Sequence, residues 1–209
     1  MLEIRDLHAW HGAAQALFGV SLTVRADELV VLQGLNGAGK STLLQAIMGM
    51  GPRVEGVICY QNESIVALPS HQRARLGLGY VPEDRRLFTA LTVQQNLLIA
   101  ARTDVARRLG EVLQLFPALK TMLGRSAAHM SGGEQQMLAI ARTLMTGPSL
   151  LLLDEPCEGI APVLVESIRD ALLSLKGRGM AMLVAEQNGI LAERADRVIT
   201  LTAQMQLRT

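Results

Sequence analysis

Hydrophobic residues recur with two different periods along this chain. Every second residue is apolar in Val20–Val24, the period of a half-buried strand, and Leu29–Leu32 is apolar throughout, as in a strand buried on both faces. The same criteria predict strands at residues 57–60, 79–81, 150–153, 180–185 and 197–201. Helical periodicity predicts helices at residues 69–76, 93–102, 105–115, 134–145 and 162–175, and another after the glycines that follow Leu32.

The order of these elements indicates the fold class. Strands and helices alternate after Ser131, which predicts an α/β domain with a mostly parallel sheet. Between about Asp84 and Met130 the pattern is helical with little strand signal, so we expect an all-helical insertion. Thr92 and Gln95 have the spacing of a capping box at the start of its first helix. At 209 residues, one domain is expected, with roughly 70% of its unfolded surface buried.

Composition narrows the possible functions. A net charge of +1 is too small to attract polyanions through bulk electrostatics, so no nucleic-acid partner is expected. Hydrophobic residues make up 49% of the chain, but stretches such as Leu150–Leu153 are far shorter than the ~20 apolar residues of a membrane-spanning helix. The N-terminal residues interleave charged with apolar side chains and contain no signal-peptide core. We expect a cytoplasmic protein with Cys59 and Cys157 as reduced thiols.

A phosphate-binding loop is predicted between the strand at Leu29–Leu32 and the helix that follows it. The segment Gly34-Leu35-Asn36-Gly37-Ala38-Gly39-Lys40-Ser41-Thr42 fits the pattern G-x-x-x-x-G-K-[ST]. Glycines allow backbone N–H groups to surround phosphates, and a helix N-terminus adds a favourable partial charge. In this context Lys40 neutralises β- and γ-phosphate oxygens and Ser41 ligates Mg²⁺.

Two acids end the strand at Leu150–Leu153. Asp154 is expected beside the phosphate loop, where it can hold Mg²⁺ through water, and Glu155 can orient or deprotonate an attacking water. A strand followed by an acidic turn is common and weak evidence by itself. Its position after a phosphate loop makes the prediction specific.

A third segment, Ser131-Gly132-Gly133-Glu134, precedes the helix predicted at residues 134–145. Ser131 and Glu134 have the spacing of a capping box, which accounts for these two residues and leaves both glycines unexplained. Glycines at a helix N-terminus would expose N–H groups as a second phosphate site. The two interpretations are compatible.

The order of these three segments resembles that of an ATP-binding cassette (ABC) ATPase across essentially the whole chain. The resemblance implies a P-loop (RecA-like) core with a mostly parallel sheet, an antiparallel β subdomain and a helical subdomain. We expect one domain over residues 1–209, with the core and β subdomain in about 1–83 and 131–209 and the helical subdomain in about 84–130. The resemblance also implies that Ser131, Gly132, Gly133 and Glu134 contact ATP on the phosphate loop of a second ABC subunit.

Finer motifs resemble the ATPase subunits of importers for branched-chain amino acids, related amides and urea. They are Gly79-Tyr80-Val81-Pro82-Glu83-Asp84-Arg85-Arg86-Leu87-Phe88, Cys157-Glu158-Gly159-Ile160-Ala161-Pro162 and Ala185-Glu186-Gln187-Asn188. Glu83 stands where most cassettes have Gln, and Gln187 where most have His; both residues occur in this subfamily. Gln187 can donate to a γ-phosphate oxygen without carrying charge. Glu83 has two interpretations. It reaches Mg²⁺ or the attacking water, or it is a solvated carboxylate in a loop.

Other positions depart from the broader pattern or have two interpretations. Cys157 replaces a small polar residue near the expected subunit interface, and Asp27 replaces a usual Gly. Cassettes usually stack an aromatic ring on adenine; His11 aligns there, while Trp10 beside it either stacks or packs against the protein. Arg85–Phe88 either receives a permease segment or forms an ordinary basic surface.

The resemblance therefore predicts an ATPase that uses ATP and Mg²⁺ to drive uptake of branched-chain amino acids or related amides or urea. Its expected partners are a second ABC subunit, identical or paralogous, membrane permease subunits and, indirectly, a substrate-binding protein. Its expected place is the cytoplasmic face of the membrane. The alternatives are a soluble ABC ATPase of repair or translation and a plain P-loop kinase, which would not need the segment at Ser131–Glu134.

Overall fold

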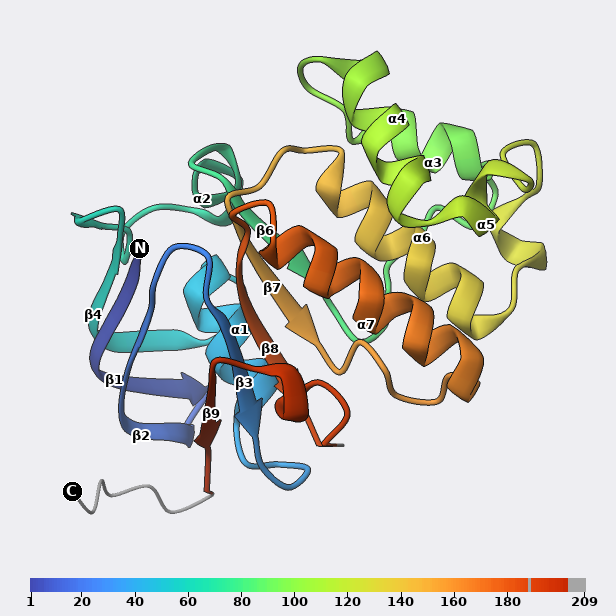
Figure 1. The fold of residues 1–209 in the computed structure, drawn as a ribbon. Coiled ribbons are helices and arrows are strands. Elements are labelled where there is room, and N and C mark those ends of the chain that lie inside the picture. Colours follow the sequence, from blue (N-terminus) through green and yellow to red (C-terminus); the bar gives the residue numbers. More distant parts are fainter. Residues whose placement is uncertain (188, 203–209) are drawn as a thin grey trace.

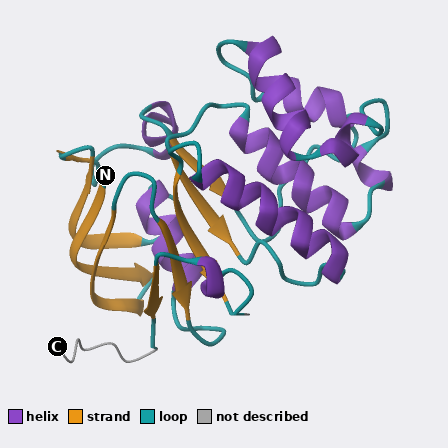
Figure 2. Ribbon diagram, viewed as in Figure 1, coloured by secondary structure: helices purple, strands orange, loops and turns teal. Residues whose placement is uncertain are grey.

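A computed structural model describes residues 1–187 and 189–202, and contains two sheets (Figures 1 and 2). Asn188 and the last seven residues lie outside the described part. Five parallel strands form the larger sheet in the order β6 (Leu78–Val81), β7 (Leu150–Asp154), β8 (Ala181–Glu186), β3 (Leu29–Gln33) and β9 (Arg197–Thr200). The smaller, antiparallel sheet has the order β2 (Ala14–Val24), β1 (Leu2–His11), β4 (Arg53–Tyr60) and β5 (Glu63–Ser64). The expected fold class is confirmed.

The α-helices of the described residues either lie against the parallel sheet or pack in a group beside it. They are α1 (Lys40–Met48), α2 (Ser70–Arg75), α3 (Val93–Ile99), α4 (Val105–Leu115), α5 (Pro117–Lys120), α6 (Gly132–Leu144) and α7 (Pro162–Lys176). The capping box of Thr92 and Gln95 is present, but α3 ends three residues before the predicted Arg102. Helices α3 to α6 gather at one side of the molecule, with α7 next to α6 (Figure 1). No described helix is long and apolar enough to cross a membrane.

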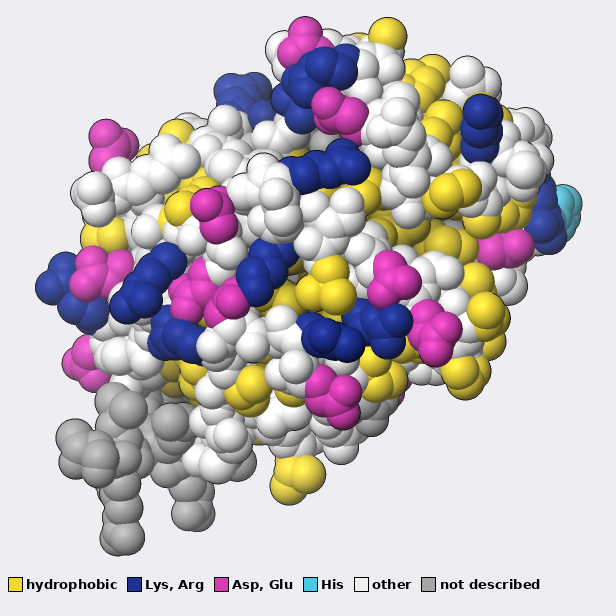
Figure 3. Space-filling view, in the orientation of Figure 1, with side chains coloured by type: hydrophobic (Ala, Val, Ile, Leu, Met, Phe, Trp, Pro, Cys, Tyr) yellow, Lys and Arg dark blue, Asp and Glu magenta, His cyan; other side chains and the backbone are white. Residues whose placement is uncertain are grey.

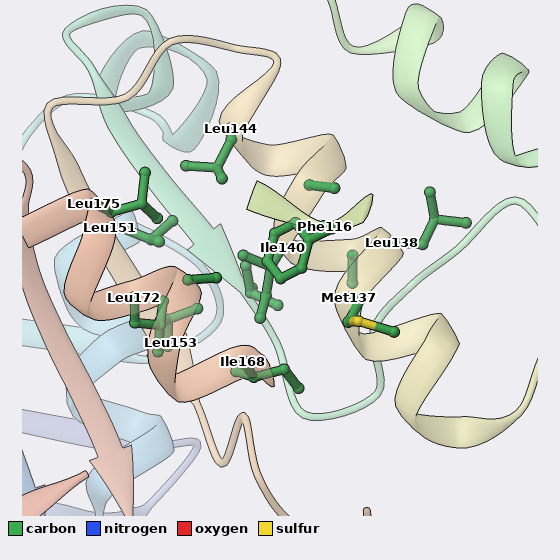
Figure 4. Packing of buried hydrophobic residues seen from close by; sticks show 14 of the residues in the cluster. Phe116, Met137, Leu138, Ile140, Leu144, Leu151, Leu153, Ile168, Leu172 and Leu175 are labelled. Carbon is green, nitrogen blue, oxygen red and sulfur yellow. The ribbon is translucent and has the colours of Figure 1, made fainter. Parts of the chain in front are cut away.

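Successive residues of the central strands contribute to two different cores. Leu151 and Leu153 of β7 belong to the cluster that contains α6 and α7 (Figure 4), whereas Leu150 and Leu152 belong to the cluster that contains α1 and the antiparallel sheet. Successive side chains of a strand point to opposite faces of its sheet. Because both faces are covered, β7 is apolar at every position before Asp154, which is the sequence pattern of a buried parallel strand.

Strand β1 does not follow a simple alternation. Leu2 and Ile4 are buried, and then Leu7 and Ala9, so the buried positions change from even to odd numbers. The pairing register shifts between Ile4 and Leu7, and Asp6 has a φ of 47°, as expected for a bulge. This shift explains why hydrophobic alternation does not identify β1.

Charged side chains of both signs are interspersed over the face seen in Figure 3. This mixture agrees with the net charge of +1. On that face there is no broad basic surface of the kind that binds nucleic acid through its phosphates.

Candidate functional site

The phosphate loop connects β3 to α1 and has the backbone that its glycines allow. Gly37 and Gly39 have φ values of 81° and 97°, in the left-handed region that side chains disfavour. A Cβ at Gly39 would lie 2.7 Å from Leu17 Cδ2 and 3.0 Å from the Ala16 carbonyl oxygen. Gly39 is therefore required by both its conformation and its close packing against β2.

Lys40 is the first residue of α1, and its ammonium group faces the acidic end of β7. Its Nζ lies 2.9 Å from Glu155 Oε1 and donates to the carbonyl oxygen of Gly34 at 2.7 Å. Both side chains are buried, with 5% and 8% exposed. The two charges of the pair are thus compensated inside the protein.

Asp154, the last residue of β7, is held by a donor on each side. Ser41 Oγ donates to its Oδ1 at 2.9 Å, and Tyr80 Oη donates to its Oδ2 at 3.1 Å. Burial raises the pKa of Asp154, while these two hydrogen bonds act to lower it. The two hydroxyls fix the orientation of the carboxyl group.

Lys40, Ser41 and Glu155 line a cleft of about 280 Å³. The phosphate loop supplies Asn36, Gly37, Gly39, Lys40, Ser41 and Thr42, and the other lining residues are Ala16, Leu35, Glu83, Glu155 and Glu158. Glu83 is exposed and also lines an adjoining hollow with Ser41 and Asp154. Most of the expected nucleotide and metal residues, distant in sequence, thus meet at the carboxyl edge of the parallel sheet, where α/β folds bind ligands. Gly34, Ala38 and Gln187 line a separate hollow with Leu201.

Gln187 and Glu155 are linked through the backbone. The Gln187 N–H donates to Glu155 Oε2 at 3.1 Å, and the Glu155 N–H donates to the Ala185 carbonyl oxygen at 2.9 Å. Glu155 itself has a φ of 46°, a strained value for a side-chain-bearing residue and one that clusters at functional sites. The chain at the end of β8 therefore fixes the direction of the Glu155 carboxylate.

Ser131–Glu134 lies apart from the residues that line the cleft. Ser131 Oγ accepts from the Glu134 N–H at 3.4 Å, and Glu134 Oε2 accepts from the Ser131 N–H at 2.7 Å. The predicted capping box is therefore present at the N-terminus of α6. Ser131 is exposed, and none of the four residues is among those that line the cleft.

The structure gives Gly133 a packing role that the sequence did not reveal. A Cβ there would overlap Leu164 and lie 2.9 Å from Ile160 Cγ2, at the start of α7. At Gly132 the nearest atom, in the Arg85 guanidinium, would be 3.4 Å away. The two glycines therefore differ: Gly133 allows α6 to approach α7, whereas Gly132 is free of such a clash.

His11 and Trp10 have different surroundings. His11 is exposed, and its Nε2 lies 3.2 Å from Thr42 Oγ1 on α1. The Trp10 ring is covered by the Arg53 guanidinium at 4.2 Å and stacks on His8 with ring centroids 6.0 Å apart. Trp10 therefore packs against its own sheet, and His11 is the ring that lies at the phosphate-loop helix.

Cys157 and Glu186 form a buried polar pair close to Glu155. Cys157 and Glu186 are 4% and 1% exposed, and burial raises the pKa of each. Glu186 Oε2 accepts from the Leu191 N–H, while its Oε1 has no hydrogen-bond partner among the described residues. Both cysteines are free thiols; Cys157 is buried and Cys59 is half-buried.

The cleft fits ATP and Mg²⁺ by the chemistry of its donors. The phosphate loop offers a glycine backbone, the start of a helix and an ammonium group, as phosphate binding requires. Ser41, Asp154 and Glu83 present the oxygen atoms that Mg²⁺ prefers. These features define a P-loop nucleotide-binding site.

The fold and site together define an ATPase of the cassette type. The ABC transporter family profile matches residues 17–158, so the chain belongs to the ABC transporter family and is an ATP-binding subunit with ATPase chemistry.

Relatives match along most of their length. The chain is 43% identical over 206 residues to the high-affinity branched-chain amino acid transport ATP-binding protein BraG of Pseudomonas aeruginosa, covering 96% of this chain and 88% of that protein. It is 37% identical to the probable branched-chain amino acid transport ATP-binding protein LivF of Archaeoglobus fulgidus, with 90% and 82% covered. It is also 37% identical to the lipopolysaccharide export system ATP-binding protein LptB of Escherichia coli K12, with 90% and 80% covered.

Solved structures agree with this assignment. A nucleotide-free ATP-binding cassette from an ABC transporter superposes with a TM-score of 0.86 at 26% identity, covering 97% of this chain and 88% of that chain. An ATP-binding cassette solved as a dimer with ADP and phosphate after hydrolysis gives 0.85 at 25% identity, with 97% and 95% covered.

Proposed function

We propose that the chain energises import of branched-chain amino acids or related small amides or urea. The observation that carries this proposal is the cleft lined by Lys40, Ser41, Glu83 and Glu155, with Asp154 in the adjoining hollow and the Gln187 N–H bonded to Glu155. Glu83 and Gln187 are the two residues that resemble the importer subfamily. The relatives named for branched-chain amino acid transport support the substrate class.

In this proposal each residue of the cleft has one task. Lys40 leaves Glu155 to neutralise the β- and γ-phosphate oxygens, and Glu155 then takes a proton from the attacking water. Ser41, Asp154 and Glu83 hold Mg²⁺, which neutralises charge on the phosphates when it is bound. Gln187 donates to the γ-phosphate, and His11 stacks on adenine.

A second ABC subunit completes each site. Ser131, Gly132, Gly133 and Glu134 lie outside the chain's own cleft, and Ser131 is exposed at the N-terminus of α6. Such a helix end favours an anion. We infer that these residues contact ATP held by the phosphate loop of a partner cassette, so that two subunits enclose two nucleotides.

A membrane permease is the second partner. Phe88 is exposed next to the arginines at residues 85 and 86, and Arg86 lines a groove of about 270 Å³ together with Met48, Met50, Ala100 and Thr143. We propose that a cytoplasmic segment of the permease docks at this groove, which places the chain at the cytoplasmic face of the membrane. A substrate-binding protein would then act through the permease. In this proposal residues 1–209 act as one domain, with residues 84–130 as its helical unit.

Uptake and purification test the proposal. In the organism that carries the chain, deletion of its gene should abolish uptake of the transported amino acid or amide, and the unmodified chain but not Lys40→Ala should restore it. Affinity purification from membranes should recover permease subunits. A normal uptake profile with defective lipopolysaccharide export would instead favour the role of the LptB relatives, and recovery with ribosomes or DNA would favour the soluble alternative.

A further inference from the structure

Tyr80 contacts both the metal side of the nucleotide site and the groove proposed to receive the permease. It lies in the middle of β6, where its Oη donates to Asp154 Oδ2 at 3.1 Å. It also lines the groove between α1, α3 and α6 that is bounded by Met48, Ala100 and Thr143. One side chain therefore contacts both a metal-ligand residue and the groove.

The contact with Asp154 uses the second oxygen of the carboxyl group. Ser41 Oγ holds Oδ1 at 2.9 Å, so the two hydroxyls together determine how Asp154 is rotated. Tyr80 Oη is the donor in the hydrogen bond to Oδ2, as Ser41 Oγ is in the hydrogen bond to Oδ1. Removing this donor leaves Asp154 held from one side only.

The groove and the metal side share a wall. Tyr80, Pro82 and Arg86 line both the groove and the hollow that contains Ser41, Glu83 and Asp154. The Tyr80 ring is rigid, so a shift of the ring caused by an occupant of the groove moves its hydroxyl by a similar amount. A hydrogen bond of 3.1 Å tolerates a displacement of only a few tenths of an ångström before it weakens.

We propose that Tyr80 is a positioning residue that links occupancy of the groove to the orientation of the metal-ligand residue Asp154. The proposal rests on the proposed function in one respect, namely that the natural occupant is a permease segment. Because coupling between two sites is reciprocal, metal and nucleotide in the cleft then alter the affinity of the groove for its occupant by the same factor.

Mn²⁺ binding to the purified chain with saturating ADP provides the first test, measured by the electron paramagnetic resonance signal of free Mn²⁺. Tyr80→Phe should weaken Mn²⁺ binding about ten-fold, the effect typical of losing a residue that orients a metal ligand. Its affinity for ADP in EDTA should stay unchanged. The chain offers a matched control, because Tyr60 donates to or accepts from Ser149 Oγ at 2.6 Å, away from the cleft.

Tyr60→Phe also deletes one buried phenol hydroxyl, and it should leave the Mn²⁺ affinity unchanged. Equal Mn²⁺ affinities for Tyr80→Phe and the unmodified chain would overturn the proposal. An equal loss in both variants would overturn it as well, because the effect would then follow general loosening of the fold.

Filling the groove tests the link itself. Ala100→Phe, or Ala74→Leu if that variant does not fold, places a larger side chain in the groove. Each should change the Mn²⁺ affinity several-fold when Tyr80 is present and leave it unchanged in the Tyr80→Phe background. An equal effect in both backgrounds, or none in either, would show that Tyr80 does not carry the link.

These measurements need no permease, so their failure is separable from failure of the proposed function. If uptake and permease recovery succeed while Tyr80→Phe binds Mn²⁺ normally, only the role of Tyr80 is overturned. If Tyr80 behaves as expected and no permease is recovered, the identity of the groove's occupant is overturned.

Discussion

Lys40 and Glu155 form a buried ion pair with 2.9 Å between Nζ and Oε1, across the cleft where phosphates are expected. The residue proposed to bind the γ-phosphate and the residue proposed to activate water therefore neutralise each other in this structure. Phosphate oxygens must compete with Glu155 for Lys40. Binding of the nucleotide would thereby free the carboxylate for its task as a base.

Glu155→Gln should separate binding from hydrolysis. The amide cannot accept a proton from water, so we expect ATP turnover to fall by at least about 10²-fold, the lower range for a general base. ATP should bind at least as tightly, because the Lys40 ammonium loses its charged partner. Steady-state phosphate release and equilibrium nucleotide binding measure the two effects.

Glu158→Gln is the matched control for this prediction. Glu158 lines the same cleft three residues further on, but its side chain is exposed. Its turnover should remain within about two-fold of the unmodified chain, since its side chain makes no hydrogen bond or ion pair with the described residues and is not proposed to act on water or metal. Full turnover in Glu155→Gln would refute the assignment of Glu155 as the base.

Gly133→Ala should destabilise the protein although alanine is the better helix former. The added methyl group meets Leu164 and Ile160, and overpacking of this kind costs about 1–3 kcal/mol, more than the ~1 kcal/mol gained from helix propensity. Gly132→Ala, which has space, should be neutral or slightly stabilising. Urea denaturation measures both, and Leu164→Ala should recover part of the loss in Gly133→Ala. Equal stabilities of the two glycine variants would contradict the packing role.

Much of the fold follows from local sequence patterns, and the exceptions have identifiable causes. The apolar strand at Leu29–Leu32, the loop at Gly34–Thr42 and the cap at Thr92 are each determined by residues next to one another. Strand β1 is different, because the bulge at Asp6 changes which positions are buried. Alternation cannot be recognised across such a change.

The site shows the same limit. The neighbourhood of Lys40, Ser41, Asp154 and Glu155 could be expected because the carboxyl ends of parallel strands share one edge of a sheet. The hydrogen bond from Tyr80 could not, because it depends on pairing between β6 and β7, which are far apart in sequence. Tyr80 lies opposite Leu152 in that register, two residues before Asp154 and on the same face of the sheet. The clash that keeps Gly133 small likewise depends on where α7 packs.

Glu186→Gln should make stability less dependent on pH. Burial raises the pKa of Glu186 in the folded protein, so its protonated form is favoured there. Its contribution to stability is complete below the unfolded pKa of about 4.3, and it is lost as the pH rises through the higher folded value. The free energy of unfolding of the variant, minus that of the unmodified chain, should therefore increase between about pH 4 and pH 8.

Urea denaturation at constant ionic strength over this pH range measures the difference. Glu166→Gln, on the exposed face of α7, is the control and should parallel the unmodified chain. A constant difference between Glu186→Gln and the unmodified chain at every pH would show that Glu186 titrates alike in the folded and unfolded states.

Arg73→Met should be strongly destabilising, because Arg73 ties the end of α1 to the chain before α2. Arg73 is 2% exposed, and its guanidinium donates to the carbonyl oxygens of Ala46 and Ile47, in the last turn of α1, and of Val66 and Leu68, each at 2.8 Å. A cation at this end of the helix also complements its dipole, whose other end faces the phosphate cleft.

Methionine keeps most of the volume of Arg73 and removes every donor, leaving buried carbonyl oxygens unpaired. The expected loss is about 3–5 kcal/mol in the free energy of unfolding, since several hydrogen bonds from one charged group are lost. Arg75→Met, on the exposed side of α2, should change stability by less than ~0.5 kcal/mol. A loss as small for Arg73→Met as for Arg75→Met would mean that water replaces the guanidinium at these carbonyls, and that the end of α1 is held by its remaining contacts.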